Sequence, residues 1–323
     1  MKELTLDQWI GLRSGLEEKL SPESLAAWQL QKLKAQARYA VTHSRFWRQF
    51  YAGVDLEQPE SWPLLDQDTL RSAGMDMLCL PQREIQRVST LLSSGSSGLP
   101  KRLYFSQDDL ELSIDFFAYG MATLTQPGDR VWIAMNGPAA DSLGDLLARG
   151  LRRMGRKPLI YGEITDLQQA SAAVWAEQPH CLVGLSRQML ALCRETPELR
   201  PRTVLLSAEN VPEALRREIQ NTWQTEVYAH WGMRETGLGG AVECSAHAGY
   251  HIRHGDLFLE IIDPESGERL PLGQRGELVI STLNRQAMPL LRYRSGDFAE
   301  LLGGRCPCGS SLIRLGYVEG HEK

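Results

Sequence analysis

Hydrophobic residues near the start of the chain recur in a helical pattern. Between residues 21 and 51 they are separated by basic and glutamine residues, and they are Leu25, Trp28, Leu33, Ala37, Tyr39 and Val41. The segment PESWPLLDQDTL ends this pattern, because its prolines favour extended or turn geometry. Asp66 or Asp68 is expected to cap a helix that begins near Thr69. We therefore predict a helical N-terminal lobe over residues 1–85.

Short apolar runs and helical patterns alternate over residues 86–240. The order is VSTLLSS, DDLELSIDFFAYGMATL, DRVWIAM, DLLARGLRRMG, KPLIYG, HCLVGL, RQMLALCRE, TVLLSAE, PEALRREIQNTW and EVYAHWG. Strands that alternate with helices indicate strand-helix-strand units around a parallel sheet. We predict that this segment is an α/β core with doubly wound, mostly parallel sheets.

The pattern changes after Gly240 to short strands joined by tight turns. In LFLEIIDPESGERLPLGQRGELVISTL, the stretch DPESGE is expected to reverse the chain between two alternating runs. We predict a β-rich closing lobe over residues 241–323.

Composition narrows the class of protein. Among 323 residues, 42% are hydrophobic and 23% charged, and a net charge of −5 gives no electrostatic reason to expect nucleic acid as a partner. No run approaches the roughly 20 apolar residues that span a bilayer, and the start, MKELTLDQWIGLRSGLEEKL, is acidic and amphipathic. We expect no membrane contact and a cytoplasmic location. Six cysteines are too few and too unevenly placed for a disulfide framework.

A loop of serines and glycines follows the first apolar strand candidate. Its residues are Ser93, Ser94, Gly95, Ser96, Ser97 and Gly98, and Lys101 comes soon after them. Backbone N–H groups and serine hydroxyls in such a loop can surround a phosphate, and the lysine adds a cation. The loop is not a Walker A motif, because the GK[ST] ending is absent. On composition alone, a flexible Ser/Gly loop is the alternative.

The order of later motifs gives the loop a context. It is followed by LLSAE at residues 205–209, YAHWGMRET at residues 228–236 and YRSGD at residues 293–297. This order resembles the adenylate-forming superfamily, which includes acyl-CoA synthetases, firefly luciferase and peptide-synthetase adenylation domains. The stretches SRFWRQFY, PLLDQDTL, GDRVWIAMNG, EIIDPESGE, PLLRYRSGD and CPCG are most similar to its phenylacetate-CoA ligase branch.

The resemblance implies a role for each matching residue. The serine-glycine loop and Lys101 would hold the β and γ phosphates of ATP, and Asp297 would bind both ribose hydroxyls. Glu235 would bind Mg²⁺, and Lys101 and Glu235 are the expected catalytic residues. The rest of the expected ATP/AMP site is made of Ser207, Ala208 and Glu209 at the adenine, with His230, Trp231, Gly232 and Met233 in the segment that flanks it. The alternatives are that Glu235 is solvated surface and that Asp297 is a turn former.

A second group of residues has the composition of a metal site. Cys244, His251, Cys306 and Cys308 can supply three thiolates and one imidazole, a common tetrahedral set for structural Zn²⁺. His247 is a rival for the imidazole, and His251 is preferred because its Gly-x-His setting resembles the phenylacetate branch. The alternative is that these cysteines are reduced and unliganded.

The implied function is activation of a carboxylic acid by ATP to an acyl-adenylate, with CoA as the eventual acceptor. Transfer to a carrier or partner protein and nucleotide binding without catalysis are the alternatives. Residues from WIAMNGP, the segment 184–186 and HWGM are expected to line the acid pocket, with a slight preference for an aryl acid over a short hydrophobic one. The oligomeric state stays open, with a homodimer as one option.

The end of the chain departs from the superfamily's pattern. Relatives continue with a Gly-Arg-x-Asp-Asp hinge and a small domain that supplies a lysine, whereas residues 315–323 read LGYVEGHEK. We expect a naturally short protein without the small C-terminal domain. The missing lysine would then be absent, come from another chain or be replaced by Lys101, and adenylation would be slow or dependent on a partner.

Overall fold

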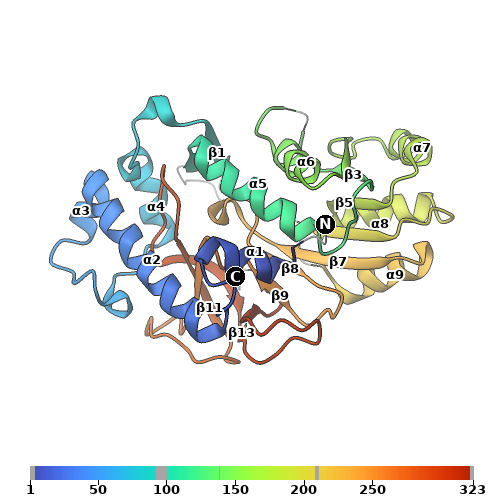
Figure 1. Cartoon of the computed structure of the whole chain (residues 1–323). Coiled ribbons are helices and arrows are strands. Elements are labelled where there is room, and N and C mark those ends of the chain that lie inside the picture. The colour runs from blue at the N-terminus through green and yellow to red at the C-terminus, as the bar shows by residue number, and fades with distance from the viewer. Residues whose placement is uncertain (1–3, 92–99, 138, 208–210, 321–323) are drawn as a thin grey trace.

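The structure is a computed structural model that describes residues 4–91, 100–137, 139–207 and 211–320 (Figure 1). The helices are α1 (Leu6–Ser14), α2 (Pro22–His43), α3 (Arg45–Phe50), α4 (Gln67–Ala73), α5 (Gln107–Met121), α6 (Leu143–Arg153), α7 (Leu167–Glu177), α8 (Ser186–Glu195) and α9 (Glu213–Trp223). The strands are β1 (Arg87–Leu91), β2 (Lys101–Phe105), β3 (Arg130–Ala134), β4 (Lys157–Ile160), β5 (Cys181–Leu185), β6 (Thr203–Ser207), β7 (Glu226–Trp231), β8 (Ala241–Glu243), β9 (Tyr250–Ile252), β10 (Leu257–Ile262), β11 (Gly276–Thr282), β12 (Tyr293–Ala299), β13 (Leu301–Leu302) and β14 (Arg314–Leu315). Short 3-10 helices lie at η1 (Pro59–Ser61), η2 (Gly74–Met77), η3 (Gln82–Glu84) and η4 (Arg234–Thr236).

A mixed sheet runs through most of the described chain. Its strand order is β13-β14-β9-β8-β7-β6-β5-β3-β4, in which β4, β3, β5, β6 and β7 are parallel and the strands beyond β7 are antiparallel. The expected α/β fold with a mostly parallel core is therefore confirmed. The same sheet continues from β7 into β8, so it crosses the position near Gly240 where the sequence suggested a new lobe.

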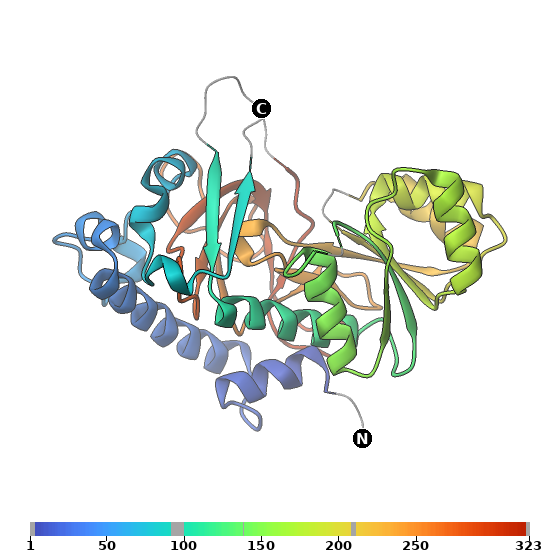
Figure 2. The same cartoon turned by 90° about the horizontal axis from the view of Figure 1, so that it is seen from above.

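Helices cover both faces of the parallel strands, as expected for a doubly wound core. Along β3, Val131 and Ile133 pack with α5 and α6, whereas Trp132 and Ala134 pack with α7, α8 and α9. Successive side chains of a strand point to opposite faces, so one apolar run serves two cores. Figure 2 shows this lobe at the opposite end of the molecule from α2 and α3.

The strand predicted from VSTLLSS does not join the parallel sheet. β1 pairs with β2 as an antiparallel two-stranded ribbon, with Leu91 opposite Lys101. The expectation that this run belongs to a strand-helix-strand unit is wrong, because the chain returns along itself after the serine-glycine loop. That loop therefore joins the two strands of a hairpin, which stands between the two ends of the molecule (Figure 2).

The three strands β10, β11 and β12 form a separate antiparallel sheet. The expected reversal in DPESGE lies between β10 and β11. Asp263 starts this turn, and its side chain accepts hydrogen bonds from the backbone N–H groups of Glu265 and Ser266 at 3.0 and 2.8 Å. An aspartate that binds the backbone two and three residues on stabilises a tight turn.

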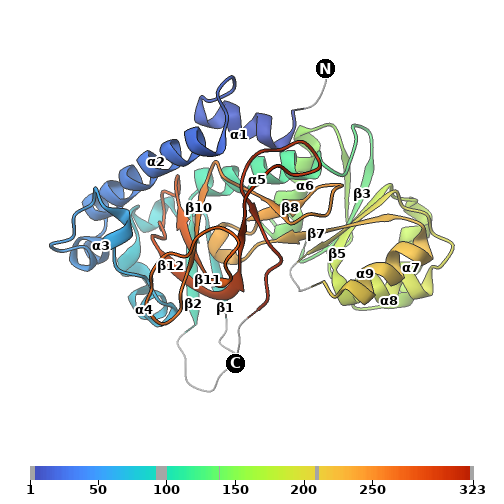
Figure 3. The same cartoon turned by 90° about the horizontal axis from the view of Figure 1, so that it is seen from below.

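The N-terminal helices pack along the closing segments of the chain (Figure 3). Ser21 caps α2, and the buried Gln29 and Gln36 of that helix donate to backbone carbonyl groups of His254, Leu257 and Arg285. Of the two expected caps for α4, Asp66 is the one used, with its carboxylate 2.6 Å from the backbone nitrogen of Thr69.

The strand order reverses between β3 and β5. The chain passes from β3 to β4 on one side, then returns to place β5 on the other side of β3. In open α/β sheets, ligands bind at the carboxyl ends of the strands at such a switch point. Within the described residues, no helix is long and apolar enough to span a membrane.

Candidate active site

Three residues that are far apart in sequence meet in one buried contact. Lys101 begins β2, Glu235 lies in η4, and Tyr293 begins β12. Lys101 forms an ion pair with Oε1 of Glu235, and its Nζ lies 3.1 Å from the hydroxyl of Tyr293. The same hydroxyl donates to Oε1 of Glu235 at 3.2 Å. Glu235 is 1% exposed and Tyr293 is fully buried, so these residues form a buried polar cluster and not an ion pair on the protein surface.

The environment keeps the hydroxyl of Tyr293 protonated. Burial raises its pKa, and the negative charge of Glu235 raises it further. The hydroxyl can therefore accept a hydrogen bond from Lys101 and donate one to Glu235 at the same time. Asp297, on the same strand, is close enough for its charge to contribute to the same rise.

The contact is connected to both strands of the β1–β2 hairpin. Lys101 follows the loop on β2, and Arg234, next to Glu235, donates to the backbone carbonyl of Thr90 on β1 at 2.5 Å. Both strands of the hairpin are thereby tied to η4. Residues 93–98 of the loop, together with Ala208 and Glu209, lie outside the described residues.

The segment after β7 depends on small residues. Gly237 has a φ of 79°, and a Cβ at Gly239 would lie 2.7 Å from the ring of Phe116. The ring of Trp231 packs against Gly240 and is only 8% exposed, within the core around β8 and β9. Met233 precedes η4, and its backbone nitrogen donates to Oγ1 of Thr236 at 3.2 Å. The glycines hold η4, and hence Glu235, against α5.

A small cavity lies at the switch point of the sheet. Its volume is about 30 Å³. It is lined by apolar side chains of β5, β6, β8, α5 and α6 and of neighbouring loops, with Ser207 on β6 and His230 on β7 as the polar ones. Oγ of Ser207 and Nδ1 of His230 are 3.1 Å apart. Burial lowers the pKa of His230 to about 4, so its imidazole is neutral near pH 7.

The four residues expected to bind zinc come together. The ligand atoms of Cys244, His251, Cys306 and Cys308 all lie within 4.8 Å of one another. The Cys244 and Cys306 sulfurs are 3.7 Å apart, and the Cys308 sulfur is 3.5 Å from Nε2 of His251. His247, the rival ligand, is instead engaged through Nδ1 with Arg216 at 3.2 Å.

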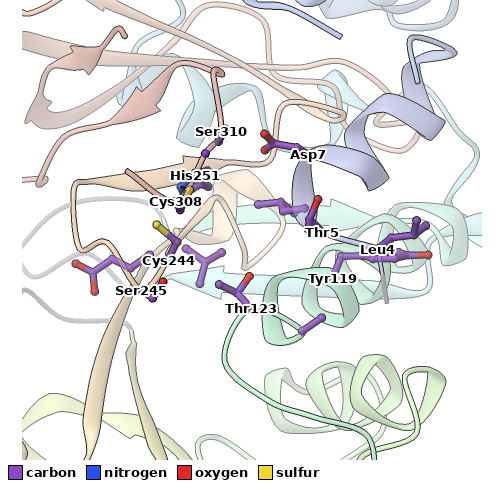
Figure 4. Close-up of a pocket in the computed structure, with 15 residues that line it drawn as sticks. Leu4, Thr5, Asp7, Tyr119, Thr123, Cys244, Ser245, His251, Cys308 and Ser310 are labelled. Carbon is purple, nitrogen blue, oxygen red and sulfur yellow. Dashed lines mark hydrogen bonds between the residues drawn. The ribbon is translucent and has the colours of Figure 1, made fainter. Parts of the chain in front are cut away.

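This cluster borders a pocket of about 550 Å³ between the start of α1 and the end of α5 (Figure 4). Cys244, His251 and Cys308 lie on one side of it, with Thr5 and Asp7 on the other. None of the residues of the Lys101 contact lines this pocket. The cysteine-histidine cluster and the nucleotide motifs are therefore separate sites.

Comparison with known proteins identifies the family. The family model of AMP-binding enzymes matches residues 60–287, which is more than half of the chain. This chain belongs to the AMP-binding enzymes. Phenylacetate-coenzyme A ligases of Thermus thermophilus and Pseudomonas putida are 29% and 28% identical to it, over 94% of this chain and 72% of theirs. The expected resemblance to that branch is confirmed.

Solved structures of CoA ligases share the fold. A 2-hydroxyisobutyryl-CoA ligase, in complex with 2-HIB-AMP and CoA, superposes with a TM-score of 0.83 at 23% identity, covering 94% of this chain and 69% of that one. A long-chain-fatty-acid-CoA ligase from Archaeoglobus fulgidus gives a TM-score of 0.55 at 13% identity, covering 73% and 52%.

In this AMP-binding enzyme, the expected site residues divide between two places. Lys101 and Glu235 meet directly, and Asp297 lies near them, whereas Ser207 and His230 line the cavity at the switch point. Tyr293 was not among the expected site residues, although its motif was. The sequence signal that could have identified Tyr293 is its place at the start of the YRSGD motif. Its contact with Lys101 depends on strand pairing, which the local sequence pattern does not show.

Proposed function

We propose that this protein activates a carboxylic acid with ATP, forming an acyl-adenylate and releasing pyrophosphate, and that CoA then accepts the acyl group. The observation that carries the proposal is the contact of Lys101, Glu235 and Tyr293. It brings the end of the serine-glycine loop, the HWGMRET segment and the YRSGD segment to one buried point. Family membership and the names of the curated relatives support the same activity.

The reaction needs positioning and charge neutralisation more than proton transfer. An oxygen of the substrate carboxylate attacks the α-phosphorus of ATP, a new C–O–P linkage forms, and the bond to the β-phosphate oxygen breaks. A carboxylate is already ionised near neutral pH, so no side chain must act as a base. The backbone of residues 93–98 and the ammonium group of Lys101 would hold the phosphates, and Asp297 would bind the ribose hydroxyls.

The surroundings of Glu235 fit a magnesium ion. The contacts with Lys101 and Tyr293 both end on Oε1, and no described residue forms a hydrogen bond with Oε2. Mg²⁺ in ATP-using enzymes is held by one or two carboxylates together with phosphate oxygens. The ion would offset negative charge on the phosphates when bound.

The cysteine-histidine cluster fits a structural zinc ion. With zinc–sulfur bonds of about 2.3 Å, two thiolates of a tetrahedral site lie about 3.8 Å apart. The 3.7 Å between Cys244 and Cys306 matches that spacing, and four protein ligands leave no open position for substrate. The metal would join the segment after β8 to the turn that precedes β14.

Isotope exchange between ATP and pyrophosphate tests the proposed activity. The full chain is incubated with labelled pyrophosphate, ATP, Mg²⁺ and a panel of aryl and aliphatic acids, with and without CoA. Exchange that requires an acid, and acyl-CoA formation when CoA is added, are the expected results. ATP binding without exchange for any acid would leave nucleotide binding as the function.

A further inference from the structure

The cavity at the switch point has one polar wall. Ser207 ends β6 and His230 lies on β7, next to each other in the sheet, and the remaining lining side chains are apolar. They are Phe116, Phe117, Met121, Met135, Leu143, Leu147, Val183, Leu205, Leu238 and Val242. An apolar pocket with a few convergent polar groups is the usual form of a small-molecule site.

The two nitrogens of the His230 ring have different surroundings. Nδ1 is 3.1 Å from the hydroxyl of Ser207, whereas Nε2 is buried and has no hydrogen-bond partner among the described residues. Leaving such an atom unpaired is unfavourable, because it has lost its hydrogen bonds to water. A ligand atom that pairs with Nε2 would recover that loss.

We infer that the acid activated here carries an uncharged hydrogen-bonding substituent, such as a hydroxyl, on its acyl group, and that His230 recognises this substituent through Nε2. The inference rests on the proposed function, because it assigns the cavity to the acyl group of the same reaction. A neutral imidazole in an apolar wall can pair with a hydroxyl as donor or acceptor. It cannot compensate a second carboxylate, whose burial without a cation is very costly. A hydrocarbon acid would leave Nε2 unpaired.

The size of the cavity does not determine whether the acyl group of the acid is aliphatic or aromatic. A cavity that holds benzene measures roughly 150 Å³, so an aromatic or a short aliphatic acyl group requires lining side chains, such as Met121 or Met135, to move from their present positions. Methionine side chains adapt easily to such changes. Both short aliphatic and aromatic acids therefore belong in the test, each compared with its own hydroxylated form.

Binding of stable acyl-adenylate analogues tests the inference without requiring turnover. Acyl-sulfamoyl-adenosines are titrated into the full chain by calorimetry: butyryl against 3-hydroxybutyryl, and phenylacetyl against its three ring-hydroxylated forms. In at least one pair, we expect the hydroxylated analogue to bind roughly 10- to 100-fold more tightly. His230→Leu should abolish this preference. His43→Leu, at an exposed histidine on α2, is the matched control and should keep it.

Binding of AMP alone separates two kinds of failure. His230→Leu must unfold cooperatively in urea as the unmodified protein does, and His230→Gln, which keeps a hydrogen-bonding group, replaces it if the leucine variant does not fold. The inference is overturned if the unhydroxylated analogue binds equally well or better in every pair, or if His230→Leu keeps the preference. If no acyl group improves on AMP, the proposed function itself fails.

Discussion

Lys101 and Glu235 form an ion pair, and both lie within reach of the hydroxyl of Tyr293. The carboxylate assigned to Mg²⁺ is thus already neutralised by the cation assigned to phosphate. Binding of Mg²⁺ and ATP would exchange this pairing for two others, lysine with phosphate and carboxylate with metal, so each side chain would have a partner of opposite charge in both arrangements.

Glu235→Gln is expected to slow acid-dependent pyrophosphate exchange by about 100- to 1000-fold, because a transition-state charge partner is lost. The amide also binds Mg²⁺ more weakly, so the Mg²⁺ concentration for half-maximal rate should rise. Both are measured by exchange assays over a Mg²⁺ series. Glu213→Gln, at an exposed position of α9, should change neither. An unchanged Mg²⁺ dependence in Glu235→Gln would remove this residue from the metal site.

Tyr293→Phe tests whether the hydroxyl contributes to stability as the geometry indicates. The change keeps the buried ring and removes the group that accepts from Lys101 and donates to Glu235. The free energy of unfolding in urea should fall by about 1–2 kcal/mol. Tyr119→Phe is the control, since the hydroxyl of Tyr119 makes no hydrogen bond among the described residues. Equal losses in the two variants would contradict the assignment.

Elemental analysis tests the metal site. The purified protein should contain about one equivalent of zinc, and Cys308→Ser should reduce it to less than half, because one of four ligands is lost. Cys193→Ala removes a buried cysteine on α8, away from the cluster, and should leave the zinc content unchanged. Less than half an equivalent in the unmodified protein would argue against the site.

Acid should destabilise the protein through its buried histidines. Burial lowers the pKa of His230 and of His254 to about 4, from an ordinary value of 6.5. Between these values the unfolded chain takes up protons that the folded chain does not, so stability falls as the pH drops from 6.5 towards 4. Each histidine should contribute roughly 1–3 kcal/mol to this fall.

The pH effect is measured as the free energy of unfolding in urea at pH 7, 6, 5 and 4. His230→Leu should make the dependence shallower, and His43→Leu should leave it as it is, since His43 is exposed. A slope that is the same in all three proteins would show that His230 titrates alike in the folded and unfolded states.

Much of the fold follows from local pattern in the sequence. The runs from DRVWIAM to EVYAHWG gave β3 to β7 and the helices between them, although α7 was not singled out, and DPESGE gave the β10–β11 turn. The pairing of β1 was wrong because its partner β2 was not recognised. Nothing within VSTLLSS distinguishes a strand that joins a parallel sheet from one that forms a hairpin.

The sequence predicted the candidate site as a set of residues, without the contacts between them. The order of the motifs predicted that Lys101, Glu235 and Asp297 bind the same ligand. It did not predict the direct contact of Lys101 with Glu235. His230 was expected beside the adenine, and the structure places it on the wall of the cavity with Ser207. That outcome depends on the neighbouring register of β6 and β7, which no local signal contains.

Because β13 and β14 are short, a metal ion at the cysteine-histidine cluster would protect the edge of β9. β14 covers the edge of β9 with only two residue pairs, and β13 adds two more. An uncovered strand edge offers free N–H and C=O groups to another chain and invites aggregation. A metal that fastens Cys306 and Cys308 to Cys244 and His251 would keep this thin cover in place, so protein stripped of zinc should associate through β9 before its parallel core unfolds.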